Sequence, residues 1–294
     1  MSPNFLLYSL VCLMVLCWSG NYVAAKIVFR ELPAMIVMCL RTIVAGVLII
    51  PIYWFQARKK PTIWTWGEFW LLFALGVIGI TMNQFFWTLG VERTTVVHSS
   101  MIMATTPLFV LLMAGIMQLE RITVLKVIGI VTALCGVALL QLVRSTSSAH
   151  GPTFLGDFLT LLCALLLAGT TALGKRYKPV SGGIAVNAVG YVGGSLLLLP
   201  VLWWSAQGFN FAHVSAAAWT GVFYMGAFSS ITGYLIYYYA LARIPASRMA
   251  AFQYLQPVFA SLMAVVLLGE QLSGTAIAAG AIIFTGVFVT ERFG

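Results

Sequence analysis

Amide and aromatic side chains interrupt the apolar stretches of this sequence at a small number of places. Trp18 and Asn21 belong to the segment WSGN, and Asn83 precedes Trp87 by one helical turn on the same face. Amides donate and accept hydrogen bonds, and indole rings offer apolar and π surfaces. Such groups suit the binding of a small polar molecule. The alternative for Asn21 is an interhelical hydrogen bond that only holds its helix in place.

Further polar residues extend this candidate lining along the chain. Gln84 stands beside Asn83, Tyr234 and Tyr237 follow at helical spacing, and Gln253 lies in the next apolar stretch. If these stretches span a membrane, their polar groups are expected to face the interior of the helix bundle, where they mark solute pathways. We therefore predict that they line a central cavity.

Two prolines lie in the middle of apolar stretches. Pro107 and Pro257 each remove one helical hydrogen bond, which would free the carbonyl groups of Met103 and Gln253. A freed carbonyl in a membrane must face protein or a water-filled cavity. These carbonyls would then meet an ammonium or hydroxyl group of a solute. The alternative is a pair of helix kinks that only shape packing.

Arg41 and His98 are a basic residue and a histidine within apolar stretches, and His98 lies about one turn from the start of its stretch, near the periplasmic face. Arg41 lies about eight residues into its stretch, roughly 12 Å deep at 1.5 Å per residue, where a charge must find partners. It could bind a substrate carboxylate, but a tie to backbone carbonyls or to a glutamate is the favoured interpretation. His98 could act as a proton-sensitive gate or could be an ordinary interfacial residue.

The sequence contains no recognisable catalytic or metal-binding constellation. It has no Gly-x-Ser-x-Gly and no HExxH, and the five cysteines lie inside apolar stretches without CxxC spacing. The three histidines are far apart in the sequence. We therefore expect no enzyme activity, no metal and no cofactor.

Composition identifies a membrane protein. Of 294 residues, 61% are hydrophobic and 8% are charged, whereas a soluble domain carries about 25% charged residues. A membrane span needs about 20 apolar residues. The chain offers ten such stretches with short connections, at residues 5–25, 34–55, 68–91, 95–117, 123–142, 154–175, 184–204, 216–240, 247–268 and 274–292.

The basic residues predict the orientation of these spans. The net charge is +9, but the lysines and arginines fall in short clusters between spans, a pattern of topology signals rather than of a nucleic-acid-binding face. Of the sixteen lysines and arginines, eleven lie in the even-numbered loops and at the C-terminus, and four lie in the odd-numbered loops. The remaining one is Arg41, which lies within a span. This bias places both termini in the cytoplasm of a cell whose inner membrane holds the protein.

The first and second halves of the sequence resemble each other. A shift of 150 residues places Pro107 on Pro257 and Glu120 on Glu270, and a shift of 149 places Gly20 on Gly169. This predicts two five-span repeats, at residues 1–146 and 147–294. Because five is odd, the second repeat enters the membrane from the opposite side. The predicted fold is thus an all-α polytopic membrane protein of two inverted-topology repeats, an architecture typical of secondary transporters.

Several short motifs, in this order, resemble the EamA-like group of the drug/metabolite transporter superfamily. They are WSGN at 18–21, Pro33 with Leu40-Arg41, Pro107 with LERIT at 119–123, and Pro257 with LGEQLS at 268–273. The resemblance covers the whole chain. It implies a ten-span fold, export of small metabolites, and a cavity lined by spans 1, 3, 4, 6, 8 and 9. It does not imply a particular substrate.

The remaining motif residues have structural interpretations. Thr123 and Ser273 are predicted N-caps of spans five and ten, and Glu120 and Glu270 are predicted hairpin residues. Small residues recur along these two spans, which predicts that they pack closely together; they are Gly129, Ala133, Gly136, Ala279 and Gly286.

The sequence favours a carrier over an enzyme, a receptor or a structural protein. All seven acidic residues lie at span ends, which argues against obligatory ion coupling through a buried carboxylate and against a cationic substrate. We expect a small zwitterionic or neutral solute, such as an amino acid or a derivative. The alternative is a multidrug or organic-cation exporter. Lipid and a second copy fit the apolar faces equally well, so the oligomeric state stays open.

Overall fold

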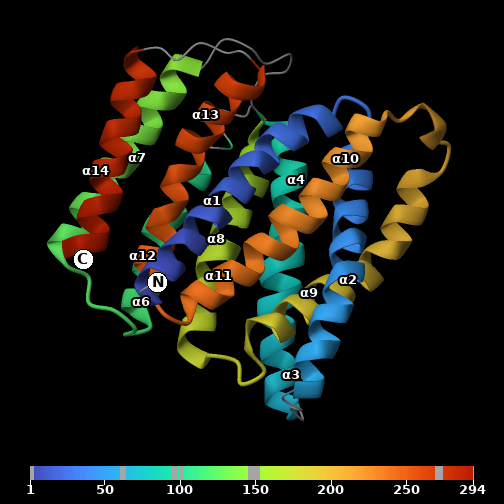
Figure 1. Cartoon of the computed structure of the whole chain (residues 1–294), viewed down its shortest axis with the longest axis horizontal. Helices are drawn as coiled ribbons and strands as arrows, with labels where there is room; N and C mark the ends of the chain where they lie inside the picture. The colour runs from blue at the N-terminus through green and yellow to red at the C-terminus, as the bar shows by residue number, and fades with distance from the viewer. Residues whose placement is uncertain are drawn as a thin grey trace. The chain divides into compact units, whose positions relative to one another are not determined.

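The computed structural model describes residues 3–59, 64–94, 99, 102–144, 153–268 and 274–293, and these residues fold into helices without strands (Figure 1). Helical segments occur within all ten predicted spans. Five helices are long and apolar enough to cross a membrane by themselves: Phe5–Ala25, Ala34–Lys59, Trp66–Arg93, Phe154–Tyr177 and Gly182–Ala206. Shorter apolar helices include Thr106–Ile116 and Val124–Leu139.

The helices form two compact units. The first comprises Met1–Leu89 with Tyr177–Tyr239, and the second comprises Gly90–Arg176 with Ala240–Gly294. Each unit therefore draws on both halves of the sequence. The predicted repeats, 1–146 and 147–294, describe sequence similarity and remain a prediction, whereas the compact units describe packing.

The first unit is built around α2 (Ala34–Lys59) and α9 (Gly182–Ala206), which pack along each other. Its other elements are α1 (Pro3–Val28), α3 (Trp66–Phe73), η1 (Ala74–Met82), the start of α4 (Asn83–Arg93), η2 (Phe211–His213), α10 (Ala216–Tyr224), η3 (Met225–Thr232) and most of α11 (Gly233–Leu241). Two backbones approach closely where Gly76 meets Gly190: a β-carbon on Gly76 would lie 2.6 Å from the Gly190 nitrogen. Glycine at both positions lets the two backbones touch.

Two spans of the first unit change their winding midway. In α3–η1–α4 and in α10–η3–α11, an α-helix continues as a π-helix and then returns to α-helix. A π-helix has more residues per turn and is rare, and it often occurs at functional sites. An offset of 150 residues places Met82, the last residue of η1, on Thr232, the last residue of η3.

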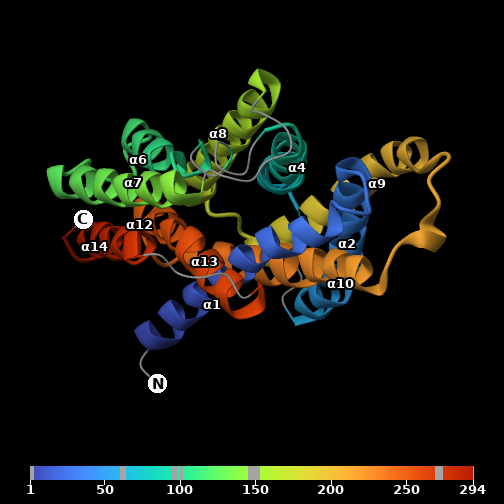
Figure 2. The ribbon, with the colours of Figure 1, turned by 90° about the horizontal axis from the view of Figure 1, so that it is seen from above.

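The second unit contains α6 (Thr106–Ile116), α7 (Val124–Arg144), α8 (Phe154–Tyr177), α12 (Ala246–Ala251), η4 (Phe252–Tyr254), α13 (Leu255–Leu268) and α14 (Gly274–Phe293). Helices α7 and α14 lie side by side in both views (Figures 1 and 2). A β-carbon on Gly129 would lie 2.8 Å from the Gly286 carbonyl oxygen. The predicted close packing of spans five and ten is therefore confirmed.

The predicted cap of span five is also present. The Lys126 backbone N–H donates to Thr123 Oγ1 at 3.2 Å. Ser273 and Glu270 lie outside the described residues.

Large apolar side chains cover the outer surface of these helices. Trp66, Trp203 and Trp204 are each at least 74% exposed. Such exposure would be costly in water but suits contact with lipid, and tryptophan is enriched where membrane meets water.

Candidate functional site

Arg41 lies at the centre of a buried polar cluster in the first unit. It is 2% exposed although it is in α2, among apolar side chains. Its Nη2 donates to Ser230 Oγ at 3.2 Å and to Ser229 Oγ at 3.5 Å. Its Nε has no hydrogen-bond partner in the described part of the chain. The described carboxylates likewise form no ion pair with this guanidinium.

A hydrogen-bonded chain leads from Arg41 to α9. Ser230 Oγ donates to Gln84 Oε1 at 3.3 Å, and Gln84 Nε2 donates to the Tyr191 hydroxyl oxygen at 2.9 Å. All three side chains are buried. This series of hydrogen bonds joins three spans that are far apart in the sequence, and the side chains of Ser230, Gln84 and Tyr191 are all neutral.

Aromatic side chains form the neighbouring wall of the cluster. The Tyr234 hydroxyl donates to Asn83 Oδ1 at 3.1 Å, and Trp18 Nε1 donates to the Ser229 carbonyl oxygen at 3.0 Å. The Trp18 ring contacts Tyr234 and Tyr237, with centroids 5.4 Å and 5.7 Å apart. The Trp18 indole thus contacts Ser229, one of the two serines that Arg41 contacts, and two phenol rings pack against the indole.

The two π-helices place the polar residues of this cluster. Ser229 and Ser230 lie within η3, and Asn83 and Gln84 follow η1 immediately. Tyr191 follows Gly190, whose contact with Gly76 brings α9 against the start of η1. Thr81 Oγ1 donates to the Gly190 carbonyl oxygen at 2.7 Å and fixes that approach.

Most residues predicted to line a cavity belong to the first unit. They are Trp18, Asn21, Asn83, Trp87, Tyr234 and Tyr237, together with Arg41. Trp87 is buried and contacts the ring of Tyr22. Asn21 is 7% exposed, and its Oδ1 has no hydrogen-bond partner among the described residues. The cavity lining itself stays a prediction for all of them.

The other predicted residues belong to the second unit. Met103 and Gln253 are half-buried there, and Gln253 lies in the 3₁₀ segment η4. Pro107 is in the first turn of α6, and Pro257 is in the first turn of α13. Pro107 thus follows a turn, and Pro257 follows the 3₁₀ segment η4, so both lie in the first turn of an α-helix, where proline is tolerated. His98 lies outside the described residues.

Sequence reasoning did not single out Ser229, Ser230 and Tyr191. Serines and tyrosines are common in membrane helices, and nothing in their spacing pointed to Arg41. A usable signal for Tyr191 is its glycine-rich setting, with Gly190, Gly193 and Gly194 on either side. Glycines of this kind mark close helix contact, which is where a buried hydroxyl finds partners.

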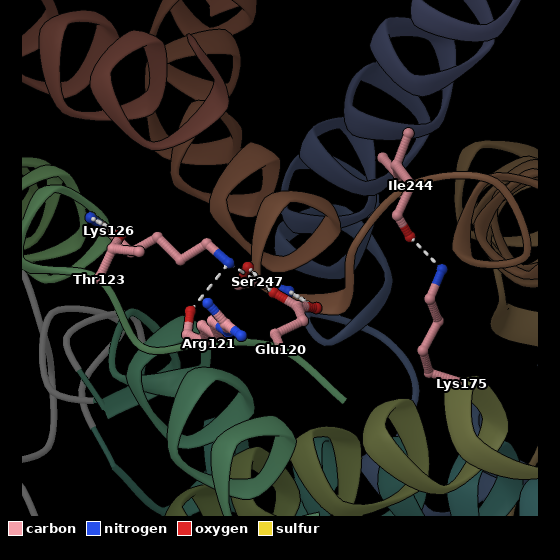
Figure 3. A network of polar contacts seen from close by, with 7 residues as sticks. All are labelled: Glu120, Arg121, Thr123, Lys126, Lys175, Ile244 and Ser247. Atoms are coloured by element: carbon pink, nitrogen blue, oxygen red, sulfur yellow. Dashed lines mark hydrogen bonds and ion pairs between the residues drawn. The ribbon is translucent and has the colours of Figure 1, made fainter. Parts of the chain in front are cut away.

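A second polar cluster ties the loop before α7 to α12 within the second unit (Figure 3). The Glu120 carboxylate accepts hydrogen bonds from the backbone N–H and the hydroxyl of Ser247, and it pairs with Lys126 Nζ at 3.1 Å. Burial raises the pKa of Glu120, but the hydrogen bonds from Ser247 and Lys126 outweigh it and leave the pKa below its usual value. Glu120, predicted to be a hairpin residue, thus also joins two spans.

Lys175 performs a similar task at the end of α8. Its Nζ donates to the carbonyl oxygens of Leu241 at 2.9 Å and Ile244 at 2.6 Å (Figure 3). Leu241 is the last residue of α11 and Ile244 follows it, so these carbonyls lie where helical partners run out. We assign this contact, like that of Glu120, to the stability of the second unit.

Apolar helices with lipid-suited surfaces define a multi-pass membrane protein, and its buried polar groups suit a transporter. The model of the EamA-like transporter family matches residues 6–142 and again residues 154–292. The chain therefore belongs to the EamA-like transporter family.

Similar proteins agree with this assignment. An uncharacterized transporter of Archaeoglobus fulgidus is 28% identical over 286 residues, which cover 96% of this chain and 97% of that protein. A probable terminal-alkyne amino-acid exporter of Streptantibioticus cattleyicolor is 29% identical over 226 residues, 74% of this chain and 71% of that protein. One crystal structure aligns with 97% of this chain and 99% of its own at a TM-score of 0.80 and 17% identity, which shows the shared fold.

Proposed function

We propose that the protein is a secondary transporter that exports small zwitterionic or neutral metabolites, such as amino acids and their derivatives, across the inner membrane. The observation that carries this proposal is the buried cluster of the first unit. It combines a guanidinium, amides, hydroxyls and aromatic rings inside a membrane protein. Polar groups are costly in that setting and mark solute pathways.

Alternating access between two inverted repeats is the proposed mechanism. The family model matches each half once, and the π-helices η1 and η3 fall at equivalent places in the two halves. Two copies of one fold, inserted in opposite directions, have equivalent inward-open and outward-open arrangements. Both termini are proposed to lie in the cytoplasm, as the basic residues predict.

The chemistry of the cluster supports the substrate class. The acidic side chains that the structure describes lie at helix ends or in loops, namely Glu31, Glu68, Glu92, Glu120 and Asp157. A purely cationic substrate would therefore meet a guanidinium rather than a carboxylate in the first unit. The amino-acid exporter of Streptantibioticus cattleyicolor also favours this class. Export of organic cations is the alternative.

A melting screen of the purified protein in detergent tests the proposal. A ligand that binds only the folded protein raises the apparent melting temperature by mass action. We expect amino acids or related zwitterions to raise it, whereas polyamines and organic cations should not. The amino acid with the largest effect is then loaded into proteoliposomes to measure its efflux. Stabilisation by organic cations alone would refute the proposed substrate class.

A further inference from the structure

We propose that Arg41 is the residue that recognises the substrate, by binding its carboxylate group. This inference rests on the proposed transport function and narrows it to solutes that carry a carboxylate. The sequence favoured a structural tie for Arg41, to backbone carbonyls or to a glutamate. Among the described residues, the hydrogen bonds of this side chain are instead with two serine hydroxyls.

The electrostatic setting of Arg41 calls for an anion. The guanidinium stays charged at any physiological pH, and an ionised group in a protein interior is costly unless it is paired. The described residues offer Arg41 only neutral partners, and a hydroxyl oxygen neutralises no charge. A carboxylate at this position would supply both the missing charge and stronger, charge-assisted hydrogen bonds.

One edge of the Arg41 guanidinium has incomplete hydrogen bonding among the described residues. Nε and Nη2 form one edge of the guanidinium, which a carboxylate can bind with both oxygens. Nε is buried and has no hydrogen-bond partner among the described residues. The bonds from Nη2, at 3.2 Å and 3.5 Å, are longer than the roughly 2.7–2.9 Å of charge-assisted bonds. A carboxylate would therefore take over this edge from two weak acceptors.

The surroundings also suit the rest of an amino acid. Trp18, which donates to the Ser229 carbonyl, presents its ring to Tyr234 and Tyr237. An aromatic face attracts an ammonium group and also packs against apolar side chains. Asn21 lies one turn beyond Trp18 on α1, and its Oδ1, which has no partner in the described ranges, can accept from an ammonium group.

The repeat shows that Arg41 is not required by the packing of this helix pair. An offset of 149 residues places Arg41 on Gly190, the residue that meets Gly76. An offset of 150 residues places Gly76 on Gly226, which contacts α2. A β-carbon on Gly226 would lie 3.0 Å from the Arg41 carbonyl oxygen. The backbone contact thus recurs with glycine in one repeat and arginine in the other, so the guanidinium serves a further purpose.

The decisive experiment compares amino acids with their amides on the wild-type protein. The amide of an amino acid keeps the ammonium group and the side chain but loses the carboxylate charge. We expect the amino acid with the largest effect to bind at least tenfold more tightly than its amide, a difference of about 1.4 kcal/mol. Equal binding of acid and amide would overturn the role of Arg41 while leaving amino-acid transport intact.

Variants of Arg41 provide a second test of carboxylate binding. Arg41→Lys keeps a positive charge but loses the flat edge, so it should weaken acid binding at least tenfold, and Arg41→Gln should abolish the preference for acid over amide. Arg58→Gln, at the exposed end of the same helix, is the matched control and should bind as the wild type does. Wild-type affinity and acid preference in Arg41→Gln would refute the inference.

The two proposals fail in different ways. If no amino acid binds the wild-type protein and organic cations do, the proposed substrate class is wrong and the carboxylate inference falls with it. If Arg41→Gln does not fold, the acid–amide comparison on the wild type and the Arg41→Lys variant still decide. A purely structural arginine would leave the wild type indifferent to the carboxylate.

Discussion

Replacing Gly136 by leucine should destabilise the second unit without altering the choice of substrate. A β-carbon on Gly136 would lie 2.8 Å from Ile283 Cγ1, 2.9 Å from the Ile283 nitrogen and 3.0 Å from the Ala279 carbonyl oxygen. Two of these three atoms are backbone atoms of α14 and cannot rotate away. Helices α7 and α14 must therefore separate to admit even the first added carbon.

The magnitude follows from two opposing effects. Leucine is a better helix former than glycine, which favours the variant by roughly 0.5–1 kcal/mol. Overpacking a well-filled contact costs about 1–3 kcal/mol for modest insertions, and here four carbons are added against backbone. We therefore expect a net destabilisation on the order of 2 kcal/mol or more.

Unfolding of the purified variant in detergent, by heat or by increasing dodecyl sulfate, measures the effect. Efflux per folded molecule and its substrate preference should equal those of the wild type. Gly274→Leu is the control, because a β-carbon at Gly274, the first residue of α14, has nothing within 4 Å. Wild-type stability of Gly136→Leu, or a changed substrate preference in a stable variant, would refute this account of α7 and α14.

Three further predictions concern transport, pH and topology. Asn83→Ala and Tyr234→Phe each break the bond from the Tyr234 hydroxyl to Asn83 Oδ1, and both should slow efflux while the protein remains folded; loss of folding would make the pair structural. Glu120→Gln should reduce the acid sensitivity of unfolding: because the pKa of Glu120 is lowered in the folded protein, its stabilisation is full above its unfolded value, near 4.5, and is lost as the pH falls through the lowered one. An unfolding curve with unchanged pH dependence in that range would contradict the role of Glu120. Reporter fusions should place both termini in the cytoplasm, and an external reporter signal at either end would reverse the proposed orientation.

Local features of the sequence were enough to predict the membrane class, the helical spans and the close packing of spans five and ten. Each of these depends on short-range properties: apolar length, the distribution of basic residues, and small residues at a helical repeat. The Thr123 cap is equally local, since its hydroxyl bonds a backbone N–H three residues later.

The partners of Arg41 could not be predicted in this way. Ser229 and Ser230 are 188 and 189 residues away, and the sequence near Arg41 contains no sign of them. The π-helices that place these serines are also invisible to pattern reasoning. Their altered winding changes which residues share a face, whereas the spacing of residues in the sequence predicts faces only for an ordinary α-helix.

The sequence by itself determined that this protein is a multi-pass membrane protein, and it predicted a repeat of two halves. Only the tertiary structure decided how the two halves share their helices, because each compact unit takes spans from both. It also decided that a guanidinium deep in α2 meets the hydroxyls of Ser229 and Ser230, and that Ser230 connects it to the amide of Gln84. The physical reason is that hydrophobic length is written along one helix, whereas the pairing of a buried charge depends on which distant helices pack against it.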